Sequence, residues 1–166
     1  MLRENIPGLG LSTDIMVGFP GETSEYFDNT YQFVKKIAFS RLHVFRYSPR
    51  QGTPAADFVD QVEPPVKEER SHRLIEIGNK LAAGFAASLI GQDLEVLVER
   101  LFEGEKNYYE GFTDNYVRSV FPGDEELCGE IAVFRAEKVR GTILEGKVIG
   151  LRHNFQVIQQ DLFSCC

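Results

Sequence analysis

The stretch LSTDIMVGFPGET, residues 11–23, decides the fold class of this 166-residue chain. Its first seven residues are mostly apolar and favour a β-strand, and the turn signal GFPG (18–21) follows directly. A Thr-Ser pair then offers an N-cap, and apolar residues recur at helical spacing. The sequence therefore predicts a strand over 11–17 and a helix over 24–37.

A second strand is predicted over 41–47, where RLHVFRY is followed by Ser-Pro and Gly-Thr-Pro turns. The order strand, helix, strand favours parallel strands joined by a crossover helix. After Pro64-Pro65, the charged start KEER (67–70) leads into a long amphipathic helix that closes at Gly91. These elements predict an α/β part over residues 1–91.

Beyond Gly91 the hydrophobic period changes from helical to alternating. Strands are expected around residues 94–99, 116–121, 130–139 and 142–149. The fold class is therefore α/β followed by all-β, with a small β-module over residues 92–150. No period is evident in the tail over 151–166, which stays unassigned.

Composition sets limits on function. Apolar residues make up 43% and charged residues 26%, as in a soluble globular protein, and the net charge of −7 argues against a generally basic nucleic-acid binder but leaves a local patch open. No apolar run could span a membrane, and a cytoplasmic location is expected by default. Cys128, Cys165 and Cys166 fit neither a disulfide framework nor a metal motif, so we assign no metal ligand and expect free thiols.

Two features could carry chemistry. The GFPG turn lies at the carboxyl end of a parallel strand, where α/β folds place ligands, although it matches neither a P-loop nor a Rossmann fingerprint. A tight turn without a ligand is the alternative. Asp14 and His43 are polar residues in strands expected to be apolar, and they could line a pocket. Taken singly, a strand-end cap for Asp14 and a core position for His43 are favoured.

Together, TDIMVGFPGET (13–23) and RLHVFRYSPRQGTPAA (41–56) resemble the last strands of the radical S-adenosylmethionine barrel of methylthiotransferases. The similarity continues through KxER (67–70) and EVLVE (95–99) to YYEGFTDNYVRSVFPG (108–123), which resembles the TRAM module of that family. The resemblance implies a partial TIM-like barrel followed by a TRAM β-barrel. Its details lean toward the branch that modifies N6-threonylcarbamoyladenosine in tRNA.

The resemblance implies a reaction in which [4Fe-4S] clusters and S-adenosylmethionine install a methylthio group at C2 of the modified adenosine. The cofactors carry that chemistry, so no catalytic residue is assigned to this chain. The family pattern places a cofactor-binding wall on seven residues: Val17, Gly18, Phe19, Glu22, Phe45, Tyr47 and Ser48. Glu22 would hold the turn, and Arg46 receives no role.

The β-module has a possible RNA-binding face. In a strand over 116–121, Tyr116, Arg118 and Val120 would share one face, so an aromatic ring and a cation could point outward together. The predicted RNA-binding residues are Lys106, Tyr116, Arg118, Lys138 and Arg140. A plain hairpin turn with core aromatics is the alternative, and tRNA, not DNA, is the partner that the resemblance implies.

The chain departs from the family in one respect, because it contains no CxxxCxxC loop for a cluster. We therefore expect a fragment whose partner is the missing N-terminal part of the enzyme and which alone neither assembles the cluster nor transfers sulfur. The alternative functions are a non-catalytic RNA-binding module with a residual half barrel, or a relative that modifies isopentenyladenosine or a ribosomal protein aspartate.

Overall fold

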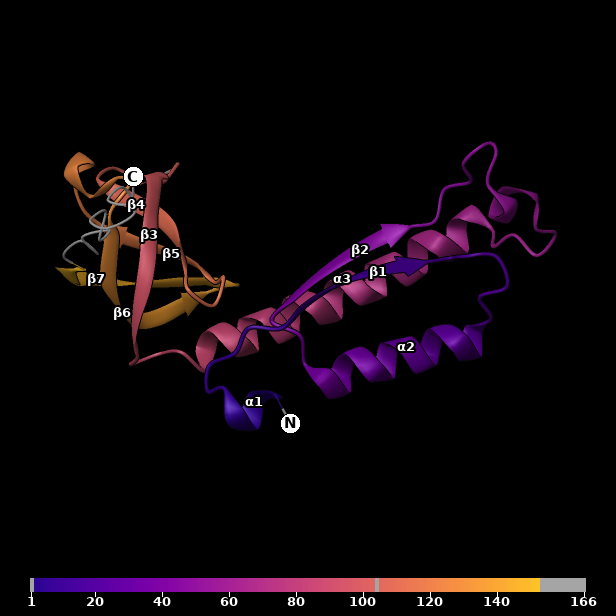
Figure 1. Ribbon diagram of the computed structural model, residues 1–166, viewed down its shortest axis with the longest axis horizontal. Coiled ribbons are helices and arrows are strands. Elements are labelled where there is room, and N and C mark those ends of the chain that lie inside the picture. Colours follow the sequence, from indigo (N-terminus) through magenta and orange to yellow (C-terminus); the bar gives the residue numbers. More distant parts are fainter. Residues whose placement is uncertain (1, 104, 153–166) are drawn as a thin grey trace, which may run out of the picture.

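The computed structural model describes residues 2–103 and 105–152, in two parts joined by one long helix (Figure 1). The first part, the layered unit, contains α1 (Leu2–Asn5), β1 (Ser12–Val17), α2 (Ser24–Ile37), β2 (Arg41–Arg46), the 3₁₀ helix η1 (Pro54–Asp57) and α3 (Pro64–Ala87). The second part, the β-barrel, contains β3 (Asp93–Leu101), β4 (Tyr108–Thr113), β5 (Arg118–Pro122), the 3₁₀ helix η2 (Glu125–Leu127), β6 (Ile131–Arg140) and β7 (Ile143–Leu151).

In the layered unit, β1 and β2 pair in parallel, with Ser12 opposite Arg41 and Val17 opposite Arg46. The helix between them, α2, is the crossover, as predicted. It begins after Thr23, whose hydroxyl accepts a hydrogen bond from Tyr26 N at 3.2 Å, and it ends at Ala38 in the left-handed conformation. The predicted strand–helix–strand arrangement is confirmed, and the two strands form a two-stranded sheet.

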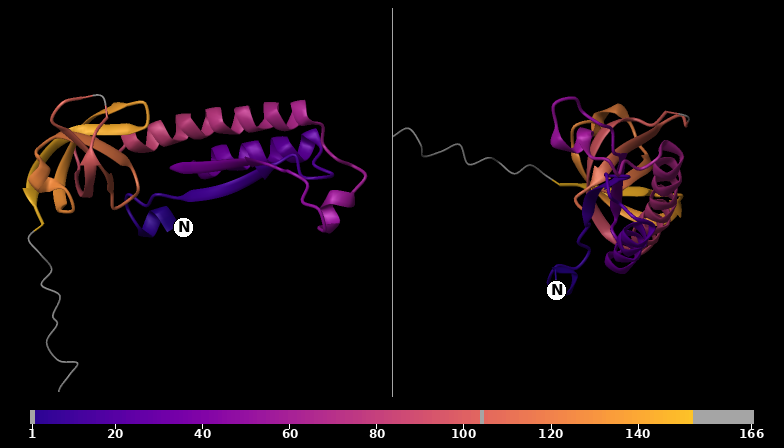
Figure 2. Two further views of the ribbon diagram at one scale, coloured as in Figure 1. Left: turned by 90° about the horizontal axis from the view of Figure 1, so that it is seen from above. Right: turned by 90° about the vertical axis from the view of Figure 1, so that its right-hand side faces the viewer.

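Both long helices of the layered unit lie on the same side of the two strands (Figure 2). Val17, Phe27, Val34 and Leu74 form the buried core on that side. On the opposite side the sheet is open: Met16 and Phe45 are 54% and 51% exposed. His43 and Asp14 lie across from each other on this open face and are also exposed, so the expected core position of His43 is wrong.

The β-barrel is closed in the strand order β3-β4-β5-β7-β6. Its core contains Val96, Phe121, Phe134 and Leu144. The sequence analysis missed β4, because Glu110 and Gly111 interrupt its apolar pattern. Gly111 is required there, since a Cβ would lie 2.0 Å from the Leu97 carbonyl oxygen of the neighbouring strand.

The two parts contact each other where α3 ends. Ala86 and Leu89 belong to the barrel core, and Gly91 N donates to Ala136 O at 2.8 Å. The hairpin between β4 and β5 reaches back, where Asn115 Nδ2 donates to Gly8 O at 3.4 Å. Although α3 has 24 residues, no described helix is both long and apolar enough to cross a membrane.

Candidate functional site

The turn after β1 is held by a buried ion pair. Gly18 and Gly21 have φ of +71° and +83°, where side chains are strained. Glu22 Oε2 accepts one hydrogen bond from Gly18 N and one from Arg70 Nη1, each at 2.6 Å. Arg70 also donates to the Glu22 carbonyl oxygen at 2.9 Å. A single carboxylate thus fixes the turn backbone and ties it to α3.

Lys67, in the first turn of α3, lies beneath both strand ends. Its side chain is buried, and Nζ donates to Tyr47 O at 3.3 Å and lies 5.1 Å from the centre of the Tyr47 ring. A Cβ on Gly18 would lie 2.3 Å from Lys67 Cγ, so the lysine stem packs where only glycine fits. Within the part of the chain that the structure describes, no carboxylate pairs with Lys67. Lys67 contacts both strand ends, Gly18 through its stem and Tyr47 through Nζ.

The residues predicted for the cofactor wall gather at the carboxyl ends of β1 and β2. Phe19 and Phe45 are exposed, at 43% and 51%, and Ser48 is exposed. Tyr47 is buried, its ring 5.1 Å from that of Phe19 in an edge-on arrangement. Its hydroxyl has no hydrogen-bond partner among the described residues. This end of the sheet therefore combines exposed rings with a buried, unpaired hydroxyl.

Val17 differs from the other residues of this set. Its side chain is fully buried in the core beneath the sheet and cannot supply apolar contact to a ligand on the open face. Its carbonyl oxygen accepts a hydrogen bond from Tyr47 N at 2.9 Å. Val17 thus joins the two strand ends and leaves the exposed contacts to its neighbours.

On the β-barrel, a group of charged side chains packs over one aromatic ring. Arg118 and Arg140 lie 5.6 and 5.5 Å from the centre of the Phe102 ring. Glu110 pairs with Arg118 and with Arg100, the latter at 2.7 Å. Glu145 pairs with Lys138 at 2.7 Å and with Arg140 at 2.6 Å. We call this set the outer ionic cluster: Arg100, Phe102, Glu110, Arg118, Lys138, Arg140 and Glu145.

The outer ionic cluster holds four cations and two carboxylates, a net charge of +2. Burial alone raises the pKa of Glu110, but hydrogen bonds and charges from Arg118 and Arg100 outweigh it and place the pKa below its ordinary value. The hydrogen bond from Lys138 is the main cause that lowers the pKa of Glu145. Both carboxylates therefore stay ionised at neutral pH and hold the cations in place, with Lys138 and Arg100 largely exposed.

Of the predicted RNA-binding residues, the structure brings Arg118, Lys138 and Arg140 together. Lys106 is exposed and has no contact with the outer ionic cluster among the interactions of the described residues. Tyr116 is not in a strand, so its predicted place on one strand face with Arg118 is wrong. It lies in the β4–β5 hairpin with φ of +62° and is 74% exposed.

Sequence reasoning missed several functional candidates. Lys67 and Arg70 were read only as the start of a helix, although their i, i+3 spacing places both on the face toward the turn. Phe102, Glu110 and Glu145 gave no local signal, because their partners lie on other strands and are brought to them by strand pairing. Within residues 2–103 and 105–152, no group of His, Cys, Asp and Glu side chains could hold a metal ion. Cys128 is exposed, and Cys165 and Cys166 lie outside the described residues.

Comparison with known proteins identifies relatives, although no family model matches the chain. The chain is 44% identical over 150 residues to the threonylcarbamoyladenosine tRNA methylthiotransferase MtaB of Bacillus subtilis (strain 168), covering 89% of this chain and 33% of that protein. It is 37% identical over 148 residues to the tRNA-2-methylthio-N(6)-dimethylallyladenosine synthase of Moorella thermoacetica, with coverage of 89% and 33%. The synthase of the same name from Methylacidiphilum infernorum is 39% identical over 145 residues, with coverage of 87% and 31%.

The chain thus spans about a third of the length of the curated relatives that it matches. The aligned part covers the GFPGET turn, the strand after it and most of the β-barrel sequence, since it includes 89% of the chain. The relatives that match 87–89% of this chain are thus of the radical S-adenosylmethionine methylthiotransferase family.

Proposed function

We propose that this chain is the C-terminal region of a tRNA methylthiotransferase that adds a methylthio group to C2 of N6-threonylcarbamoyladenosine. The observation that carries the proposal is the identity of 44% to the relative named for that nucleoside, compared with 37–39% to the relatives named for dimethylallyladenosine. In this proposal the layered unit is the last portion of the radical S-adenosylmethionine barrel and the β-barrel is a TRAM module.

The carboxyl ends of β1 and β2 would bind S-adenosylmethionine. Phe19 and Phe45 offer exposed aromatic surface, and the unpaired hydroxyl of buried Tyr47 offers a polar group without a protein partner. When bound, the cofactor and the iron–sulfur clusters supply the radical and the sulfur chemistry. The residues of this chain position the cofactor: Glu22 and Arg70 fix the turn, and Lys67 holds the backbone of Tyr47.

The outer ionic cluster would bind the tRNA backbone. The residues of the cluster carry a net charge of +2 on a chain whose overall charge is −7, with Glu99 and Glu103 near Arg100 at its edge, and Lys138 and Arg140 are 73% and 54% exposed. Phosphate contacts from Lys and Arg supply most of the affinity of such surfaces and make it depend on salt. Phe102 orients two of the guanidinium groups, so these cations are fixed before RNA arrives.

This chain alone would neither assemble a cluster nor transfer sulfur, because its sequence contains no CxxxCxxC loop. Reconstitution with iron and sulfide tests this directly. The expected result is no stable [4Fe-4S] absorbance, and a stable signature on the 166-residue chain would contradict it.

A chimera tests the function itself. The matching region of the B. subtilis MtaB relative is replaced by this chain, and digested tRNA from cells lacking the native enzyme is examined by mass spectrometry. The expected product is 2-methylthio-N6-threonylcarbamoyladenosine. The matched control carries Glu22→Ala and is expected to lose product, since the turn that holds the cofactor is released.

Two outcomes would contradict the proposal. A soluble, cluster-loaded chimera that forms no product would show that this chain does not support the reaction. Only an RNA-binding role would then be left. A chimera that forms only the methylthio derivative of dimethylallyladenosine would keep the reaction class but correct the substrate.

A further inference from the structure

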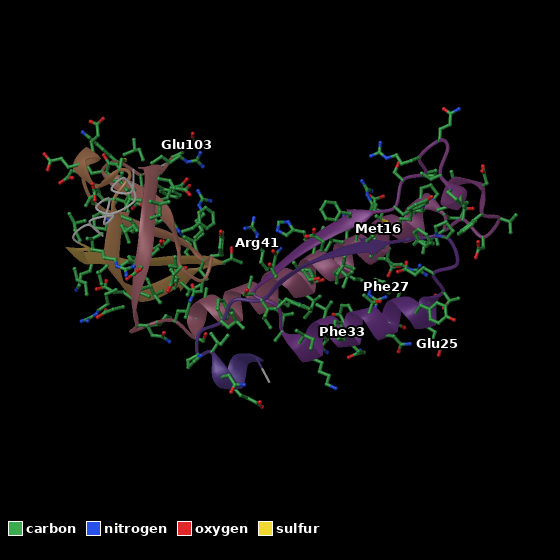
Figure 3. The ribbon with its side chains drawn as sticks, viewed as in Figure 1. Met16, Glu25, Phe27, Phe33, Arg41 and Glu103 are labelled. Carbon is green, nitrogen blue, oxygen red and sulfur yellow. The ribbon has the colours of Figure 1, made fainter. Side chains whose placement is uncertain are left out.

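A cavity of about 250 Å³ lies between the layered unit and the β-barrel. Its walls come from the start of β2, the middle of α3 and the β4–β5 hairpin. The residues that could recognise a ligand are Arg41, Asn79, Phe112, Tyr116 and Arg118. Figure 3 shows Arg41 at the end of β2 nearest the β-barrel and Met16 further along the strands.

The composition of this cavity is that of a nucleotide site. Two guanidinium groups and two aromatic rings line it together with Ser40, Asn79 and Thr142, and no carboxylate does. Aromatic rings stack on nucleobases, amides read base edges and guanidinium groups pair with phosphate. Arg41 has no ion pair with any residue in the described ranges, so its charge is available.

A neighbouring groove differs from this cavity in the charge of its lining residues. It is larger, about 610 Å³, and shares Arg41, Phe112 and Tyr116 with the cavity, but Glu95, Glu99 and Asp114 also line it. Three carboxylates repel phosphate. The smaller cavity, which no carboxylate lines, is therefore the place for a phosphate-bearing ligand.

Tyr116 is set in place before a ligand binds. A residue with a side chain at φ of +62° is strained by about 1–2 kcal/mol, and such strain is often found at ligand-binding positions. The hairpin holds Tyr116 there through a bond from Tyr116 N to Thr113 O at 2.8 Å and one from Val117 N to Thr113 Oγ1 at 2.8 Å. The hairpin thus fixes the backbone of Tyr116 and leaves its ring, which is 74% exposed, open to stacking.

We propose that this cavity takes up one unpaired nucleotide of the RNA substrate, whose base stacks on Tyr116 and whose phosphate pairs with Arg41, since Arg118 is already paired with Glu110. This rests on the proposed function. The bound nucleotide is not the one that reacts, because Arg41 begins β2 and the cofactor residues follow its other end, about 17 Å away at 3.3 Å per strand residue. The cavity thus reads a second position of the RNA.

The test titrates the 166-residue chain with an RNA stem–loop in which each loop position in turn is abasic. At one position the abasic change should weaken binding by about 5- to 150-fold, the range for loss of one base–aromatic stack. Tyr116→Gly should weaken binding to the intact RNA by the same factor and abolish the effect of that abasic position. Gly relieves the strain at φ of +62°, so the variant should remain folded, and a thermal transition at or above that of the native chain checks this.

Asn79→Ala and Arg41→Gln should each weaken binding, whereas the matched exposed residues Tyr26→Ala, Asn29→Ala and Arg50→Gln should not. If no loop position is coupled to Tyr116, the cavity proposal is wrong even where RNA binds. If free adenosine monophosphate binds as tightly as the stem–loop, a free nucleotide is the ligand and the proposal is also wrong. Failure of the chain to bind the RNA at all would instead overturn the proposed function.

Discussion

The layered unit and the β-barrel differ in how far the backbone hydrogen bonds of their strands are satisfied. In the β-barrel each strand has two neighbours, and the core is enclosed on all sides. The layered unit has only two described strands, with helices on one face and exposed Met16 and Phe45 on the other. Closure leaves no sheet edge, whereas a two-stranded parallel sheet leaves two. The barrel encloses its core within one sheet, whereas the layered unit leaves one sheet face and two sheet edges exposed.

The largest expected difference concerns folding in isolation. A fragment over residues 84–152 keeps Ala86 and Leu89 in the barrel core and should fold cooperatively, as seen by dispersed NMR signals and a sharp thermal transition. A fragment over residues 2–91 should aggregate or remain partly unfolded, because its strand edges and open face are unpaired. A monomeric, cooperatively folded 2–91 fragment would contradict the predicted difference between the two parts.

Two ion pairs of the layered unit provide the next test. Breaking the buried Glu22–Arg70 pair with Glu22→Ala should lower the free energy of unfolding by about 3 kcal/mol, because Arg70 is left buried and unpaired. The exposed Glu76–Lys80 pair is the matched control, and Glu76→Ala should change stability by less than about 0.5 kcal/mol. Denaturant titration measures both. Equal effects would show that the turn is not held by its ion pair.

Acid pH should affect the β-barrel through Glu110 and Glu145. Each carboxylate has a pKa that is lower in the folded chain than the ordinary 4.5. Their stabilisation is therefore fully present above about pH 4.5 and is lost as pH falls through the folded pKa values. Glu110→Gln should flatten the loss of thermal stability of the 84–152 fragment below pH 4.5. An unchanged pH profile would contradict the ion pairing in the outer ionic cluster.

The smallest expected effect is a change in stability at two residues with left-handed backbone conformation, one in each part. Ala38, with φ of +55°, ends α2, and Tyr116, with φ of +62°, lies in the barrel hairpin. Replacement by Gly should stabilise either part by about 1 kcal/mol, because Gly adopts this conformation without strain. RNA affinity should fall only for Tyr116→Gly. A loss of stability in that variant would mean that the ring supports the fold instead of a ligand.

Local pattern was enough to predict much of this fold. The helix over 24–37 was predicted to the residue and the strands on either side to within one residue, because each has a cap, a turn or a period of its own. The β-module was predicted, but β4 was missed, since Gly111 is there for close backbone contact and not for a strand pattern. Tyr116 was placed in a strand because its left-handed conformation gives no sequence signal.

The candidate site was less predictable. The turn residues came from a resemblance, but the contacts of Lys67 and Arg70 join distant parts of the chain, 48 residues apart for Arg70 and Glu22. The ion pairs of the outer ionic cluster join different strands. The cavity depends on how the two parts meet. No periodicity within a single element contains that information.

We propose that the outer ionic cluster makes the β-barrel of this acidic chain an RNA-binding surface. The direct measurement is titration of the 166-residue chain with tRNA carrying N6-threonylcarbamoyladenosine at 50 and 200 mM salt, for the native sequence and for Lys138→Glu with Arg140→Glu. We expect the affinity for tRNA to fall steeply as the salt concentration rises and to be abolished by the charge reversal. Affinity that is independent of salt, or that survives the reversal, would contradict it.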